Sequence, residues 1–220
     1  MENLKALTEA VCCVAREAGH FLKEERKSFR REVVQEKHAH DYVSYVDKAS
    51  EKKVVSALRK LLPEAGFIAE EGSAAYSDET YCWVVDPLDG TTNYIHDNAP
   101  YCVSIALRDK QSLLLGVVYE PCRDECFYAW KGGGAYVNGE RLRVSLVSEL
   151  KDAFVVTELP YNFEQYARTG EHLIHELYGK VAGIRMNGSA ALALCYVAAG
   201  RFDAWLEAFI GKWDFSAAAL

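Results

Sequence analysis

The sequence predicts a protein of mixed helices and strands, and three observations support this prediction. Apolar residues recur at helical spacing over residues 4–29. Three runs with β character follow one another over residues 101–130, and a hairpin signal, Asn138-Gly139, comes soon after them. In the last third of the chain, strands and helices alternate. We therefore predict an α+β half over residues 1–145 and an α/β half over residues 146–220, with a soft boundary between them.

Two helices are predicted to open the chain, one over residues 4–29 and a second that begins at Ser44. Ser44 is a candidate N-cap of the second helix, and Asp47 lies in its first turn, where the helix dipole favours negative charge. The segment between the helices, residues 30–40, is polar and aperiodic, which predicts a mobile loop. Its two histidines are expected to be solvated, because no third metal ligand lies near them in the sequence.

The chain is organised around the stretch Trp83-Val84-Val85-Asp86-Pro87-Leu88-Asp89-Gly90-Thr91-Thr92-Asn93. It opens as a buried strand, which Pro87 is expected to end, and Gly90 then permits a tight turn. Asp86 and Asp89 follow a strand too apolar to be solvated, and an isolated buried carboxylate is very costly. A divalent cation is the simplest neutralising partner, and the amides after the turn are free to bind an anion.

The other predicted elements are shorter. Glu70 and Glu71 follow a strand over residues 67–69 and, from the residues alone, are solvated acids at a strand end. Gly132-Gly133-Gly134 lacks the lysine of a phosphate-binding loop and no helix follows it, so we predict a turn. Further strands are expected over residues 101–107, 113–119, 125–130, 153–157 and 202–207, with helices over residues 161–178 and 189–199 and from Trp213 onward.

The chain stops at Leu220, soon after Asp214, so the last helix is too short to hold itself. We therefore expect residues 146–220 to be a truncated half.

Composition limits the class of protein. The 220 residues are 50% hydrophobic and carry a formal charge of −7, with a pI near 5.4. This balance predicts no electrostatic binding to nucleic acid or to an anionic membrane. No signal peptide or membrane span is evident, and the seven cysteines form no Cys-x-x-Cys pair, which favours reduced thiols in the cytoplasm.

Three motifs carry a family resemblance. The stretch from Asp86 to Asn93 resembles the signature of the inositol monophosphatase family of magnesium-dependent, lithium-sensitive sugar phosphatases. Trp213-Asp214-Phe215-Ser216-Ala217-Ala218-Ala219 is similar to a second family motif, and Glu70-Glu71 to a third. The resemblance implies an α+β fold, the layered αβαβα sandwich of the sugar phosphatases, with an antiparallel-rich N-terminal half and a mixed-sheet C-terminal half. It also implies a homodimer.

The resemblance further implies a set of site residues. Glu70, Asp86, the carbonyl of Leu88 and Asp89 would hold one metal ion, and Asp86, Asp89 and Asp214 a second. Hard oxygen ligands without cysteine or histidine favour Mg²⁺, with Mn²⁺ as the alternative. Asp47, Glu70 and Thr91 would position the attacking water, with Thr91 hydrogen-bonded to Asp47. Substrate contacts would come from Asp89, Gly90, Thr91, Thr92, Ser189, Ala190 and Glu207.

The implied activity is hydrolysis of a phosphate monoester of inositol or a similar polyol by direct attack of a metal-activated water. Thr92-Asn93 stands where relatives that hydrolyse 3′-phosphoadenosine phosphate tend to have lysine and glutamate, which favours an inositol-type substrate. Fructose-1,6-bisphosphatase, histidinol phosphatase and nucleotide 3′-phosphatase activities remain alternatives on the same scaffold. A non-catalytic regulatory binding protein is the alternative of another class; the short C-terminus favours it and the intact set of acids opposes it.

Overall fold

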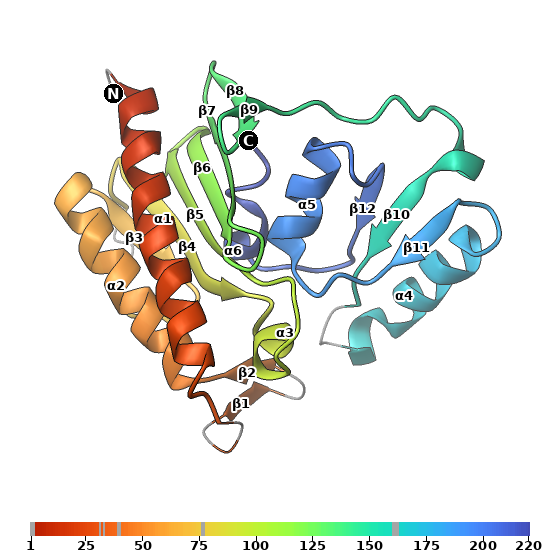
Figure 1. The fold of residues 1–220 in the computed structure, drawn as a ribbon, viewed down its shortest axis with the longest axis horizontal. Helices are drawn as coiled ribbons and strands as arrows, with labels where there is room; N and C mark the ends of the chain where they lie inside the picture. Colours follow the sequence, from red (N-terminus) through yellow and green to blue (C-terminus); the bar gives the residue numbers. More distant parts are fainter. Residues whose placement is uncertain (1–2, 31, 33, 39–40, 76–77, 160–162) are drawn as a thin grey trace.

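The protein is a five-layered α+β sandwich (Figure 1). The computed structural model describes residues 3–30, 32, 34–38, 41–75, 78–159 and 163–220. Two outer helices cover one face of a seven-stranded sheet, and two short helices separate its other face from a three-stranded sheet, which a further helix covers on the outside. The layered sandwich predicted for the family is therefore confirmed.

The outer layer consists of α1 (Leu4–Arg26) and α2 (Tyr45–Leu61). Asn3 caps α1 by accepting the amide of Ala6, and Ser44 caps α2 as the sequence predicted. Each helix buries one apolar face against the sheet, so their positions follow from sequence periodicity. The first helix ends at Arg26, earlier than expected.

The large sheet has the order β3-β4-β5-β6-β7-β8-β9. Its strands are β3 (Gly66–Ala69), β4 (Tyr81–Asp89), β5 (Cys102–Asp109), β6 (Leu113–Glu120), β7 (Glu125–Trp130), β8 (Gly134–Val137) and β9 (Glu140–Arg141). β3 pairs with β4 in parallel, and all the other neighbours are antiparallel. The predicted hairpin is confirmed, since Asn138 and Gly139 have φ of 47° and 93° between β8 and β9.

Two predictions about loops were wrong. Pro87 does not end its strand, because β4 continues to Asp89 across an irregularity in its pairing with β5. The predicted loop over residues 30–40 contains β1 (Gln35–His38), which pairs antiparallel with β2 (Asp41–Val43). The side chain of His38, and His40 as a whole, lie outside the described residues.

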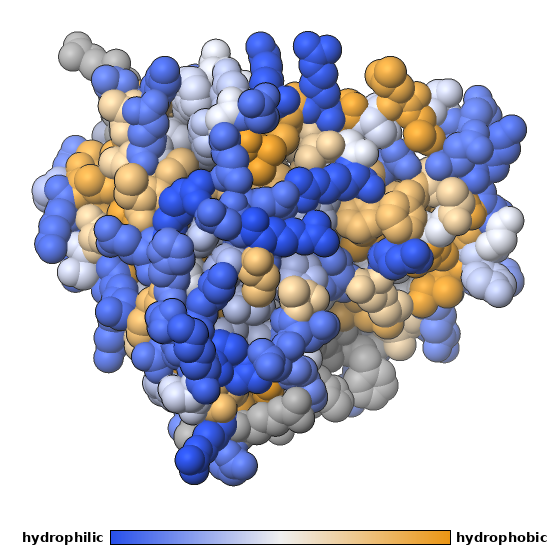
Figure 2. Space-filling model, viewed as in Figure 1, coloured by the Kyte–Doolittle hydropathy of each residue, from blue (hydrophilic) through white to orange (hydrophobic). Residues whose placement is uncertain are grey.

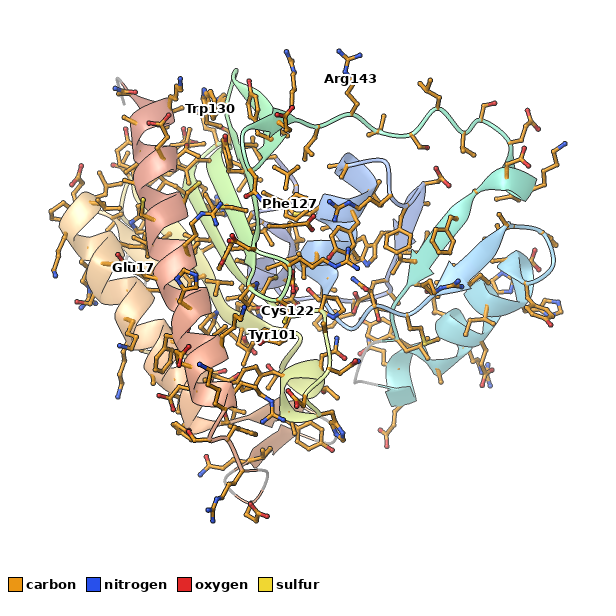
Figure 3. The ribbon with its side chains drawn as sticks, viewed as in Figure 1. Glu17, Tyr101, Cys122, Phe127, Trp130 and Arg143 are labelled. Carbon is orange, nitrogen blue, oxygen red and sulfur yellow. The ribbon has the colours of Figure 1, made fainter. Side chains whose placement is uncertain are left out.

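The inner helices α5 (Ala190–Ala198) and α6 (Lys212–Phe215) lie between the two sheets. α5 is apolar on nearly all sides because both layers bury it. Phe127 of β7 packs edge-on against Tyr196 of α5 with ring centroids 5.9 Å apart, and Figure 3 shows it on the side of the sheet away from Glu17 of α1.

The small sheet has β10 (Phe154–Thr157) in the centre, parallel to both β11 (Gly183–Arg185) and β12 (Ala204–Leu206). α4 (Phe163–Leu177) covers its outer face, and the 3₁₀ turn η2 (Leu150–Asp152) leads into it. The connection from β9 to η2 carries exposed apolar side chains, among them Val144, Leu146 and Leu150. Separate orange side chains stand out among blue ones along the top of Figure 2.

Two further features concern the cysteines and the helices. All seven cysteines are free thiols. Within the described ranges, none of the helices combines the length and apolar character of a membrane span.

Candidate functional site

A polar cavity of about 120 Å³ lies between the two sheets. Asp86 and Asp89 from the end of β4, Glu70 from the end of β3 and Asp214 from α6 all reach it. The other described residues that line it are Tyr42, Leu88, Gly90, Thr91, Glu158, Leu159, Gly188, Ser189, Ala190, Glu207 and Ile210. The three sequence motifs therefore meet in one place. Of the predicted site residues, Asp47 and Thr92 do not line the cavity.

Asp86 is an almost fully buried acid of the cavity. It is only 1% exposed, and its Oδ1 accepts the amide of Leu88 at 2.9 Å. Burial raises the pKa of Asp86 well above its usual value, and the neighbouring charges of Glu70, Asp89 and Asp214 raise it further. Such mutual repulsion among carboxylates is relieved when a divalent cation binds between them.

Asp89 is held by the start of α5. Its Oδ2 accepts the hydroxyl of Ser189 at 2.6 Å and the amide of Ala191 at 2.9 Å, and the thiol of Cys102 lies at 3.7 Å. Burial raises the pKa of Asp89 to about 6, although these donors act in the opposite direction. All three donors converge on Oδ2, so Oδ1 is not used by any of them.

These hydrogen bonds give Ser189 a role that the resemblance did not name. The resemblance placed Ser189 among the substrate contacts, and it does line the cavity. Its hydroxyl, however, is donated to Asp89, while the same oxygen caps α5 by accepting the amide of Leu192 at 3.4 Å. Ser189 therefore orients the carboxylate of Asp89.

Asp47 lies behind Thr91. Its Oδ2 accepts both the amide and the hydroxyl of Ser44, at 2.8 and 2.7 Å, which completes the cap of α2. The predicted hydrogen bond is present, since the hydroxyl of Thr91 lies 3.2 Å from Oδ1 of Asp47. The same hydroxyl lies 3.0 Å from the carbonyl of Leu88 and carries one proton for these two acceptors. Burial raises the pKa of Asp47.

The turn after β4 is tied to the loop before α5. Gly90 has φ of 93° and passes so close to the carbonyls of Pro100 and Gly188 that a side chain there would meet both at about 3 Å. Asn93 donates its amide group to the carbonyl of Pro100 at 2.7 Å and to that of Asn187 at 3.0 Å. The turn beside the acids is therefore fixed from both sheets.

Sequence reasoning missed Glu158 and Tyr42. Glu158 follows β10, and its Oε1 accepts the amides of Asn187 and Gly188 at 2.6 and 2.8 Å. Burial raises the pKa of Glu158. Burial, followed by the charges of Glu158, Asp214 and Asp89, raises the pKa of Glu207 to about 8. The only available signal for Glu158 was its place directly after a buried strand, a place that it shares with Glu70.

The donor set fits a hard divalent cation. Four carboxylates and the Leu88 carbonyl are oxygen ligands of the kind that Mg²⁺ and Mn²⁺ prefer. In the part of the chain that the structure describes, no three histidine, cysteine or acidic side chains are already closed around a metal position. The carboxylates share the cavity wall, so a cation would draw them together.

Comparisons with known proteins agree with this geometry. The sequence model of the inositol monophosphatase family matches residues 3–220. The protein is 40% identical to the Nus factor SuhB of Escherichia coli (strain K12) over 207 residues, 94% of this chain and 78% of that protein. It is 37% identical to the fructose-1,6-bisphosphatase/inositol-1-monophosphatase of Aquifex aeolicus (strain VF5) over 217 residues, 99% of this chain and 82% of that protein.

Among solved structures, the extragenic suppressor protein suhB from Bartonella henselae is similar with a TM-score of 0.91 and 36% identity. The match covers 97% of this chain and 83% of that one. Sequence, fold and cavity thus lead to one conclusion: this chain belongs to the inositol monophosphatase family.

Proposed function

We propose that this protein hydrolyses a phosphate monoester of inositol or a similar polyol with the help of Mg²⁺, or alternatively Mn²⁺. The observation that carries the proposal is the convergence on one cavity of Glu70, Asp86, Asp89 and Asp214, which come from three separate parts of the chain, the end of β3, the end of β4 and α6. Membership of a family with phosphatase relatives supports the reaction class. The choice of a polyol rests on the resemblance alone.

The metal ligands in this proposal are Glu70, Asp86, the carbonyl of Leu88, Asp89 and Asp214. A bound divalent cation supplies a lowered pKa for water and charge stabilisation for the leaving oxygen. Asp47 holds the hydroxyl of Thr91 in place, and Thr91 and Glu70 orient the attacking water. Glu70 accepts a proton from that water, and the amides of Gly90, Thr91 and Thr92 bind phosphate oxygens. Water attacks phosphorus directly, so no phosphorylated enzyme forms.

The test is phosphate release from inositol 1-phosphate with Mg²⁺ and with a chelator, in the natural protein and in Asp89→Asn. The substituted amide keeps an oxygen for Ser189 and Ala191 but loses the charge that binds metal. We expect Asp89→Asn to abolish turnover with little loss of folding. Asp152→Asn, which is exposed on η2, is the matched control and should be as active as the natural protein. An active Asp89→Asn protein would refute the assignment.

A panel of fructose 1,6-bisphosphate, histidinol phosphate and a nucleotide 3′-phosphate separates the remaining enzymatic alternatives. The substrate with the highest kcat/KM decides among them.

A regulatory binding role is the second candidate, and the name of one relative, Nus factor SuhB, favours it. In that case the family fold would present a surface to a partner, and magnesium would not stimulate turnover of any substrate in the panel. The two roles separate in Asp89→Asn, which would lose turnover and keep partner binding. Homodimerisation and a cytoplasmic location remain proposals that rest on the resemblance and on composition.

A further inference from the structure

The first two turns of α2 carry three buried polar side chains on one face. Asp47, Ser50 and Glu51 stand at helical positions i, i+3 and i+4, and each is at most 1% exposed. A buried polar side chain needs hydrogen-bond partners, and these three find theirs in three different segments around the cavity. Figure 1 shows α2 beside β3 and β4, the strands that end at the cavity.

Asp47 and Ser50 hold the end of β4 and the turn that follows it. The hydroxyl of Thr91 lies 3.2 Å from Oδ1 of Asp47, and the hydroxyl of Ser50 donates to the carbonyl of Pro87 at 3.1 Å. Pro87 lies where the pairing of β4 with β5 is irregular. Ser50 therefore supports β4 at the point where its own ladder is interrupted.

Glu51 holds the loop that carries Glu70. Its Oε2 accepts the amide of Glu71 at 2.6 Å, and its Oε1 accepts the amide of Ser73 at 2.7 Å. Hydrogen bonds of amides to a charged acceptor are short and strong. The amide of Glu70 itself donates to the carbonyl of Val85 on β4 at 3.2 Å. The backbone at Glu70 is therefore fixed by β4 on one side and by Glu51 on the other.

The loop explains why α2 buries a carboxyl group at position 51. Glu51 interrupts an apolar face whose next members are Val54, Val55 and Leu58. A carboxyl group in such a place is costly unless it is hydrogen-bonded. An apolar side chain would avoid this cost, but the two loop amides would then lose their acceptors.

We propose that Glu51 is a positioning residue that acts through Glu70, because its two hydrogen bonds set the direction in which the Glu70 carboxylate enters the cavity and so set the affinity for Mg²⁺. This inference rests on the proposed function, in which Glu70 is a metal ligand. Glu51 is not among the described residues that line the cavity, so it acts on the ion from behind the ligand. Loss of such a supporting partner typically lowers metal affinity by about 10- to 100-fold.

Glu51→Gln is the test substitution. Glutamine has nearly the size of glutamate, but it offers one acceptor oxygen and turns an NH₂ group toward a donor amide. In the metal-free variant we expect faster amide hydrogen exchange over residues 70–75 than in the natural protein. In isothermal titration calorimetry the dissociation constant of Mg²⁺ should rise by about 10- to 100-fold.

Val11→Ala is the matched control for lost stability, since Val11 is fully buried on α1 and is not among the described lining residues. Its urea midpoint should fall, but exchange over residues 70–75 and Mg²⁺ affinity should stay as in the natural protein. Ser73→Ala keeps the amide that Glu51 accepts and should also leave both readouts unchanged. An equal loss of affinity in Val11→Ala and Glu51→Gln would reduce Glu51 to a merely structural role and overturn the inference.

A double-mutant cycle tests whether Glu51 acts through Glu70. In a Glu70→Gln background, the additional change Glu51→Gln should weaken Mg²⁺ binding by about twofold at most, because the carboxylate that it positions is already lost. Effects that add in full would show that Glu51 acts elsewhere, and the inference would fail.

The natural protein gives a readout even if Glu51→Gln fails to fold. The amides of Glu71 and Ser73 should exchange slowly both with and without Mg²⁺, because Glu51 holds them before the ion binds. Protection that appears only with Mg²⁺ would contradict the inference.

The outcomes separate this inference from the function on which it rests. Magnesium-dependent hydrolysis of inositol 1-phosphate together with unchanged Mg²⁺ affinity in Glu51→Gln overturns the role of Glu51 and leaves the phosphatase in place. A natural protein that binds no Mg²⁺ overturns the proposed function, and the role of Glu51 with it.

Discussion

Asp89 is held by three donors, and these supports come from outside its own strand. The hydroxyl of Ser189 and the amide of Ala191 reach it from α5, and the thiol of Cys102 reaches it from β5. With Oδ2 held at three points, the direction of Oδ1 is set before any ligand arrives. Preorganised ligands of this kind strengthen metal binding, because less ordering remains to be done.

The Ser189 hydroxyl can be tested directly. Ser189→Ala removes a 2.6 Å hydrogen bond to a buried charge and the side-chain cap of α5. Hydrogen bonds to charged groups contribute about 1.5–3 kcal/mol, so we expect Mg²⁺ affinity to fall about tenfold or more in isothermal titration calorimetry. Ser56→Ala, exposed on α2, is the control. Unchanged affinity in Ser189→Ala would show that Asp89 needs no support from α5.

The raised pKa values of Asp86 and Asp89 predict how metal binding depends on pH. A carboxyl with a raised pKa in the folded protein keeps its proton to a higher pH, and metal must displace that proton. Affinity for Mg²⁺ should therefore rise as pH increases through about 6, the pKa of Asp89. Calorimetry in buffers of different ionisation enthalpy should detect proton release on binding below this pH. Affinity that is flat between pH 5 and 7 would contradict the shift.

In the metal-free protein, the stability of the fold changes with pH in the opposite direction to the metal affinity. Because folding raises these pKa values from 3.8, the folded state binds protons more tightly than the unfolded chain. The contribution of Asp86 and Asp89 to stability is therefore largest at low pH and declines as pH rises through about 6.

At the scale of elements, the layers on both faces of the large sheet pack so closely against it that one contact on each face requires a glycine. On one face, Gly116 of β6 lies against the backbone of Ala217, just after α6. On the other, Gly19 of α1 lies against the ring of Tyr119 on the same strand. A methyl group at either position has no room.

These two glycines offer a matched pair of substitutions. Both Gly116→Ala and Gly19→Ala should lower the free energy of unfolding by about 1–3 kcal/mol, as overpacking does, in urea denaturation. Only Gly116→Ala should also weaken Mg²⁺ binding, because it displaces the segment that carries Asp214. Equal metal affinity in the two variants would mean that the position of α6 does not govern the site.

Most elements could be predicted from the sequence because their apolar spacing is regular. α1, α2, α5 and the strands of the large sheet follow from periodicity, and the β8–β9 turn from Asn138-Gly139. The β1–β2 pair was not predicted, because its residues are mostly polar and the two strands lie only a few residues apart in the sequence. β4 was expected to stop at Pro87, but pairing resumes at Asp89 after the irregularity.

The site was predictable only where motifs mark it. Glu70, Asp86, Asp89 and Asp214 stand in motifs, and the structure places all four at the cavity. Glu158 stands in no motif. Its place at the cavity comes from the alignment of β10 with β12, which no local sequence pattern encodes. The roles assigned to these residues remain predictions, and so does the division of the chain near residue 145.

At the scale of the whole molecule, the cavity joins the two sheets. Its walls come from β3 and β4 of the large sheet, from the ends of β10 and β12, and from the segments around α5 and α6. A ligand bound there contacts both sheets at once, so it should stabilise their packing against each other.

Metal should therefore raise the stability of the entire fold. A ligand at one hundred times its dissociation constant stabilises the native state by about 2.7 kcal/mol, so Mg²⁺ should raise the midpoint of thermal unfolding by several degrees. Asp214→Asn should lose most of this increase, whereas the exposed substitution Asp152→Asn should retain it. An equal increase in Asp214→Asn would place the metal elsewhere.

The wide separation of Glu70 and Asp214 along the chain also matters while the polypeptide is being made. A ribosome has to deliver the chain as far as Asp214 before this acid can reach Glu70, so the cavity with its four acids cannot assemble on a nascent chain that ends earlier. Until then Glu70, Asp86 and Asp89 lack the part of the cavity wall that Asp214 supplies. The proposed metal centre should thus become complete only when Asp214 arrives.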